Sequence, residues 1–128
     1  WTDESELSSV IGVGATDKNN EVTSYSNYGS NIDIYAPAGT ASLGLLTLDL
    51  VGNAGDNGFD SNYSFWFGTS LSAPTISGVI ALMLSIDPTL TPNEIRSLLI
   101  NNADIVASDL TADTYPKVNT NNTLNAIP

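Results

Sequence analysis

The stretch GTSLSAPTISG, residues 68–78, runs directly into the apolar stretch VIALMLSI, residues 79–86. A proline is tolerated only in the first turn of a helix, so Pro74 predicts a helix that begins close to Ser70. The helix is apolar almost all round and ends where Asp87 is followed by a second proline. Helices of this kind are normally buried inside a larger protein, so we expect neighbours on every side.

Short apolar runs before this helix predict β-strands. SVIGVGA, residues 9–15, contains β-branched residues and glycines and is typical of a buried strand in a parallel sheet. NIDIYAP, residues 31–37, alternates and stops at a proline, which indicates a second strand. Residues 43–50 and 61–67 flank a loop rich in Gly, Asn and Asp and predict a hairpin with a long tip.

Two further helices are expected toward the end of the chain. Thr91, Pro92 and Glu94 form a helix-start signature, with threonine as the N-cap, proline at the first position and glutamate three residues after the cap. We expect that helix to reach about Asn102, and residues 123–127 allow a last short helix.

Alternating strands and helices predict an α/β layer fold with a mostly parallel sheet. Only about two of the strands resemble central parallel ones, and both these strands and the buried helix need cover on both faces. The chain of 128 residues does not obviously supply that cover. We therefore interpret residues 1–128 as one part of a larger domain, with a polar N-terminal segment at residues 1–8.

The composition narrows the choice of partners. The chain has 14 acidic and 3 basic residues and a formal net charge of −11, which argues against nucleic acid and against anionic membrane surfaces. Its longest apolar run, residues 79–86, is too short to cross a bilayer. Cysteine is absent, which excludes disulfides and cysteine metal sites. Histidine is also absent, so a serine nucleophile would need its usual base from elsewhere.

Ser70 stands at the predicted mouth of the long helix, where free backbone N–H groups and the positive end of the helix dipole meet. Such a position favours an anion, including the oxyanion formed at a substrate carbonyl. Gly68 removes a side chain just before the serine, so a substrate backbone could approach closely. The residues alone leave two interpretations open: an N-cap, which is the commoner role, and a nucleophile.

GTSLSAP, residues 68–74, resembles the nucleophile signature of the subtilisin-like serine proteases, the subtilases of peptidase family S8. Residues 10–39 resemble the two strands and intervening turns that lead toward that family's active site. Residues 72–103 resemble its buried helix and the capped helix that follows, and residues 117–127 resemble its closing segment. The similarity runs in register along nearly the whole chain, from about residue 9 to residue 127.

This resemblance implies a subtilisin-like three-layer sandwich, with the chain as the C-terminal portion of the catalytic domain. It implies a serine endopeptidase in which Ser70 attacks the scissile carbonyl and its backbone N–H helps to bind the oxyanion. Gly68 and Thr69 would border the leaving-group side of the substrate cleft. No cofactor is implied for catalysis.

The family's catalytic Asp, its catalytic His and its oxyanion Asn all lie upstream of the strand matched by residues 9–15. The partner implied is therefore the N-terminal half of the same domain, as an upstream segment or a separate chain, and the chain alone is not expected to be active. A secreted or extracytoplasmic location is implied by the family only. Two alternatives stay open: a non-catalytic subtilase-like binding or structural module, and an inactive excised fragment.

A weak structural cation site, for Ca²⁺ or Na⁺, is also implied by the resemblance. Asp33 matches a position that helps to bind it, together with backbone carbonyls near those of Leu7 and Val10. The other interpretation is an aspartate in an exposed turn. A second oxygen-rich group is more typical of a solvated loop than of a cation site; its members are Asp56, Asn57, Asp60 and Asn62.

Overall fold

The computed structural model describes residue 7 and residues 9–55, 62–107 and 113–128. Most of the polar segment 1–8 therefore lies outside the described residues. The same is true of Asp56, Asn57 and Asp60 in the oxygen-rich loop.

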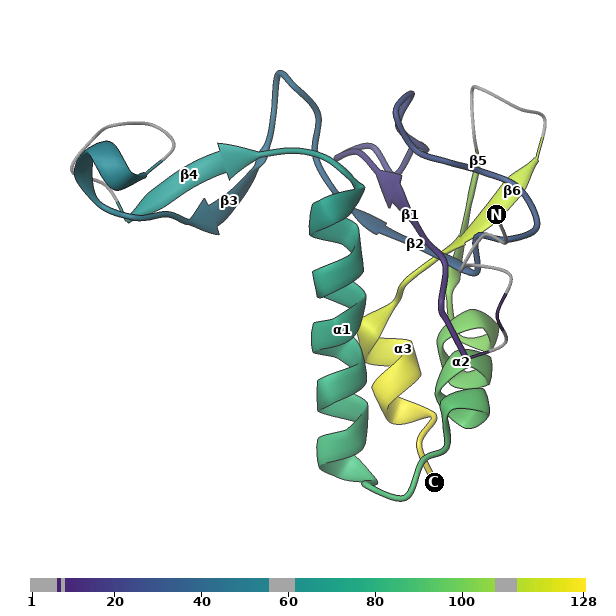
Figure 1. The fold of residues 1–128 in the computed structure, drawn as a ribbon. Helices are drawn as coiled ribbons and strands as arrows, with labels where there is room; N and C mark the ends of the chain where they lie inside the picture. The colour runs from purple at the N-terminus through teal and green to yellow at the C-terminus, as the bar shows by residue number, and fades with distance from the viewer. Residues whose placement is uncertain (1–6, 8, 56–61, 108–112) are drawn as a thin grey trace.

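A four-stranded sheet forms the centre of the chain (Figure 1). Its strands follow the spatial order β1 (Val13–Thr16), β2 (Ile34–Pro37), β6 (Thr114–Lys117) and β5 (Asp104–Ala107). β1 pairs with β2 and β2 pairs with β6 in parallel, whereas β5 and β6 are antiparallel. The predicted α/β class with a mostly parallel sheet is confirmed, and so are the strands expected within residues 9–15 and 31–37, although β1 is shorter and ends one residue later than expected.

Three helices pack against this sheet: α1 (Thr69–Ile86), α2 (Pro92–Asn101) and α3 (Thr120–Asn125). Figure 1 shows them grouped on one side, with α1 running as the longest rod. The core beneath them combines buried side chains of β2 and of the helices, namely Ile34, Ala36, Ile76, Val79, Met83, Ile95 and Leu99. These helices therefore share one apolar core with the central strand β2.

A smaller cluster lies on the other face of β2. Side chains alternate between the two faces of a strand, so Tyr35 is directed away from Ile34 and Ala36. It packs with Val22, Val106 and Tyr115 instead. Strand β2 is thus covered on both faces, as expected for a central parallel strand.

Helix α1 is buried on one stripe only, which corrects the expectation of cover on every side. Its buried side chains are Ser72, Ile76, Val79 and Met83. This spacing of three or four residues lies along one side of a helix. Leu82 and Ile86 lie off that stripe and are 50% and 54% exposed. The reason is that the described residues supply a sheet and two helices on one side of α1 and leave the rest of its apolar surface uncovered.

By length and composition alone, α1 could span a membrane, since its 18 residues have a mean hydropathy of 1.6. The expectation based on residues 79–86 considered the continuous apolar run alone, whereas the whole helix meets the criterion because the weakly polar residues of its first half lower the hydropathy only slightly. The core helix of a soluble protein meets the same criterion. The helix is therefore a weak indication of a membrane span.

The predicted hairpin is confirmed. It is formed by β3 (Leu45–Leu48) and β4 (Tyr63–Trp66), which pair antiparallel and project away from the central sheet (Figure 1). The strand register places four large apolar side chains on one face, and all are exposed: Leu46, Leu48, Tyr63 and Phe65.

The start of α2 has the predicted capping box. The Thr91 side chain accepts the backbone N–H of Glu94, and the Glu94 carboxylate accepts the backbone N–H of Thr91 at 2.8 Å. The Thr91 hydroxyl also donates to the Glu94 carboxylate, and this hydrogen bond, together with the one from the Thr91 N–H, lowers the pKa of Glu94. The short helix near residues 123–127 is confirmed as α3, although it begins at Thr120.

The antiparallel pair β5–β6 was not predicted from the sequence. Residues 104–117 include three aspartates, Asp104, Asp109 and Asp113, and Pro116 lies inside β6. Both features argue against strands when the sequence is taken alone. The pair forms because β6 adds to the edge of β2, where Tyr35 is opposite Lys117.

Burial of the Tyr35 hydroxyl, reinforced by the neighbouring Tyr115, raises the pKa of Tyr35 to about 12. The ordinary value in an unfolded chain is about 10. Because the folded state holds this proton more tightly, the associated stability is fully present below about pH 10 and is lost as the pH rises toward 12 and beyond. In Tyr35→Phe, we expect the free energy of unfolding to fall less steeply between about pH 10 and pH 12 than in the unchanged protein. Urea unfolding at a series of alkaline pH values measures this free energy. Tyr28→Phe, which removes an exposed hydroxyl, is the control and should keep the loss.

Candidate active site

Helix α1 begins at the carboxyl end of β2. The backbone N–H of Gly68 donates to the carbonyl of Ala38 at 3.2 Å, and the buried hydroxyl of Ser72 donates to the carbonyl of Ala36 at 3.1 Å. Gly68 has a φ of 133°, a conformation that L side chains rarely adopt. The carboxyl ends of parallel strands are where ligands bind in open α/β sheets, so the helix start occupies the expected place for a site.

Ser70 is the second residue of α1 and is exposed. The N-cap is Gly68, which makes no side-chain capping hydrogen bond. The N-cap interpretation of Ser70 is therefore wrong, because the cap position lies two residues earlier. The N–H groups of a first helical turn have no partner within the helix, and a glycine cap supplies no side-chain oxygen for them. Ser70 thus combines an exposed hydroxyl with a helix end suited to an anion.

Pro74 lies at the sixth position of α1, inside the helix. The helix start was predicted a residue too late, since that prediction placed the proline in the first turn. Proline has no N–H, so it cannot donate to the carbonyl of Ser70 four residues earlier.

The chain contains no histidine, so the usual general base of a serine nucleophile is not part of these 128 residues. The site residues predicted for this chain are Ser70 and the backbone of residues 68–70. In the structure these residues lie together in the first turn of α1. They form a candidate nucleophile position at a helix end suited to an anion, without a histidine to remove the serine proton.

A pocket of about 550 Å³ lies beside this turn. It is lined by the loop after β1, by Thr40 and its two following residues, and by Phe67, which directly precedes Gly68. No local sequence signal marked this pocket, because its walls come from three separate segments of the chain.

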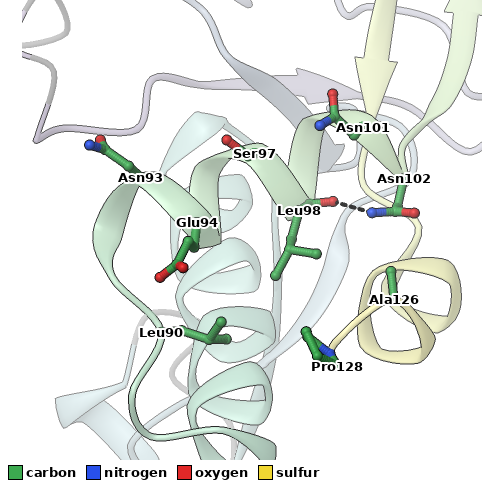
Figure 2. Close-up of a pocket in the computed structure, with 9 residues that line it drawn as sticks. All are labelled: Leu90, Asn93, Glu94, Ser97, Leu98, Asn101, Asn102, Ala126 and Pro128. Atoms are coloured by element: carbon green, nitrogen blue, oxygen red, sulfur yellow. Dashed lines mark hydrogen bonds between the residues drawn. The ribbon is translucent and has the colours of Figure 1, made fainter.

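A second pocket, of about 340 Å³, lies between α2 and the end of the chain (Figure 2). Figure 2 shows Leu90, Leu98 and Pro128 around it, with Asn102 donating to the Leu98 carbonyl at 2.8 Å. None of the predicted site residues lines it.

Asp33 is buried and makes an ion pair with Arg96 of α2. Its other carboxylate oxygen accepts the backbone N–H of Gly12 at 2.9 Å, so both oxygens are engaged. The carbonyl of Leu7 accepts the N–H of Val10 at 2.9 Å. These residues fit a bound Ca²⁺ or Na⁺ poorly, because a guanidinium already neutralises the one carboxylate of the set. The exposed-turn interpretation of Asp33 is wrong, since its side chain is 6% exposed.

The fold and the helix start together define an α/β protein with a candidate serine nucleophile at the carboxyl edge of its sheet. The model of the subtilase family matches residues 2–126, and the chain belongs to this family.

Individual relatives agree with this assignment. The extracellular basic protease of Dichelobacter nodosus is 41% identical over 100 residues, which cover 75% of this chain and 16% of the relative. Halolysin of Haloferax mediterranei is 36% identical over 96 residues, which cover 75% of this chain and 16% of the relative. The chain thus spans about a sixth of the length of these proteins.

Solved structures agree as well. A protease from Pseudoalteromonas arctica superposes with a TM-score of 0.79 at 29% identity, covering 98% of this chain and 38% of that one. A cold-adapted subtilisin-like serine proteinase gives a TM-score of 0.68 at 27% identity, covering 91% of this chain and 38% of that one. The chain therefore corresponds to part of a subtilase fold, and further parts of that fold lie outside it.

We expect Arg96→Met to lower the free energy of unfolding by about 1–3 kcal/mol, because it leaves the buried Asp33 carboxylate without its guanidinium. Urea denaturation measures this loss. The control is Lys117→Met, which removes a longer pair with the half-exposed Asp104 at 4.0 Å and a hydrogen bond to the exposed Asn20, and should cost less than about 1 kcal/mol. An equal decrease in the free energy of unfolding of the two variants would show that the Asp33–Arg96 ion pair stabilises the fold no more than the Asp104–Lys117 pair.

Proposed function

We propose that this chain is the nucleophile-bearing part of a serine endopeptidase, with Ser70 as the nucleophile. The catalytic His and Asp are supplied by an upstream segment of the same protein or by a separate chain. The observation that carries the proposal is the exposed Ser70 in the first turn of α1, behind a glycine with positive φ.

The chemistry follows from that position. The imported histidine removes the proton of the Ser70 hydroxyl, and the oxygen attacks the scissile carbonyl to give a tetrahedral intermediate. The backbone N–H groups at the start of α1, including that of Ser70, lie where they can donate to the oxyanion. Collapse of the intermediate releases the amine and leaves an acyl-enzyme at Ser70, which water hydrolyses.

The uncovered surfaces support a partner that completes the domain. Helix α1 exposes Leu82 and Ile86, and β1 lies at an edge of the sheet. An apolar helix face favours pairing with further protein, and a strand at the end of a sheet can accept a further strand where its edge is free. The partner proposed for these surfaces is the N-terminal half of the catalytic domain, which brings the histidine close to Ser70.

Secretion is part of the proposal. Two relatives, from Dichelobacter nodosus and Xanthomonas campestris, are named as extracellular proteases. The acidic composition, with a net charge of −11, is compatible with a soluble secreted enzyme.

Labelling with a fluorophosphonate probe tests the proposed function on the protein that contains this chain. We expect one label on Ser70, located by peptide mapping, because such probes modify a serine only where a base and an oxyanion site surround it. Ser70→Ala should abolish labelling and lower peptide hydrolysis by several orders of magnitude.

The matched control is Ser77→Ala, about two turns further along α1. The Ser77 hydroxyl donates to the carbonyl of Ala73 at 3.1 Å and has no proposed chemical role, so labelling should persist. A folded protein that takes no label would support the non-catalytic module in place of the endopeptidase.

A further inference from the structure

The pocket beside the start of α1 has the size of a ligand site. Its volume is about 550 Å³, within the range of small-molecule and side-chain pockets. Its walls come from the loop after β1, from the segment that begins at Thr40, and from Phe67.

The pocket lies close to Ser70. Phe67 precedes Ser70 by three residues, so their Cα atoms are at most about 11 Å apart. Thr40, which also lines the pocket, lies two residues after Ala38, whose carbonyl accepts the N–H of Gly68. An extended peptide held at Ser70 therefore carries the side chains of its nearest residues within reach of the pocket.

Two carboxylates line this pocket, from Asp17 and Glu21. The Asp17 carboxylate accepts the backbone N–H groups of Asn19 at 2.8 Å and Glu21 at 3.0 Å, which hold it in one position. Glu21 is exposed. The nearby Lys18 lines an adjacent pocket and not this one.

An aromatic wall completes the pocket. The rings of Tyr25 and Phe67 are 5.6 Å apart between centroids and tilted at 55°. The Tyr25 hydroxyl donates to the carbonyl of Gly39 at 2.6 Å, which fixes the ring. Lysine and arginine pack their aliphatic stems and cationic heads against such rings while the charge meets carboxylates.

We propose that the pocket of Asp17, Glu21, Tyr25 and Phe67 binds a lysine or arginine side chain of the peptide substrate. The preference applies to a residue within about three positions of the scissile bond, the reach that the separation between Phe67 and Ser70 allows. The excess of 14 acidic over 3 basic residues adds an attraction for basic substrates at longer range. This inference rests on the proposed endopeptidase function and names its substrate class.

Quenched fluorescent peptides test the proposal on the protein that contains this chain. The peptides are identical except for one position, which carries Lys, Gln or Glu, scanned over three positions on each side of the cleaved bond. At one position we expect the Lys peptide to exceed the Gln peptide in kcat/KM by about fivefold at low salt, with the Glu peptide slower than both. The advantage should shrink near 1 M salt, where the Debye length falls to about 3 Å.

Substitutions then assign the preference to the pocket. Glu21→Gln and Asp17→Asn remove the charges while keeping shape, and the amide oxygen that the second change introduces can still accept the two backbone N–H groups. Each variant should move the Lys-to-Gln ratio toward one. The matched control Asp104→Asn removes an equal charge on β5, outside the pocket, and should keep the ratio.

The failures of the two proposals are distinguishable. A protein that takes the fluorophosphonate label on Ser70 but cleaves the three peptides at equal rates overturns the pocket assignment alone. A Lys preference that survives both substitutions does the same. A protein without label on Ser70 overturns the endopeptidase function on which this inference rests.

Discussion

The hydrogen bond from the buried Ser72 hydroxyl to the Ala36 carbonyl fixes the start of α1 to the end of β2. A second one, from the Gly68 N–H to Ala38, holds the preceding turn against the same strand end. Because β2 lies inside the sheet, with β1 and β6 on its two sides, it is a firmly held support for the start of α1. The exposure of Ser70 and the walls of the neighbouring pocket both follow from this attachment.

The parts of the fold that the sequence predicted are those with local signals. The capping box at Thr91, the apolar run of α1 and the hairpin around the Gly-rich tip are each indicated by consecutive residues in one segment of the chain. The pair β5–β6 was missed for two reasons. Pro116 lies inside β6 and argues against a strand, and β6 joins the sheet through a long-range pairing with β2, in which Tyr35 is opposite Lys117. The burial of α1 was overestimated for a related reason. The hydropathy of a helix indicates how much apolar surface it could bury, but it does not indicate which other elements pack against that surface.

The same division applies to the candidate site. The motif around Ser70 predicted the nucleophile position, and the positive φ of Gly68 agrees with the need for glycine there. The ion pair between Asp33 and Arg96 joins residues 63 positions apart and leaves no mark in either local sequence. The pocket at Phe67 is assembled from three loops, so its two carboxylates looked like ordinary turn residues.

The position of β6 also dictates an order of assembly. Strand β6 is near the end of the chain, yet it occupies the place next to β2, and β5 reaches the sheet only through β6. During synthesis, β1 and β2 emerge long before β6, and β2 then presents an edge of unpaired backbone N–H and C=O groups until residues 114–117 arrive. Pairings of such long sequence separation form slowly, and open parallel edges are prone to wrong association. The late arrival of β6 thus lengthens the time during which the segment that carries Ser70 is exposed to wrong association before the sheet is complete.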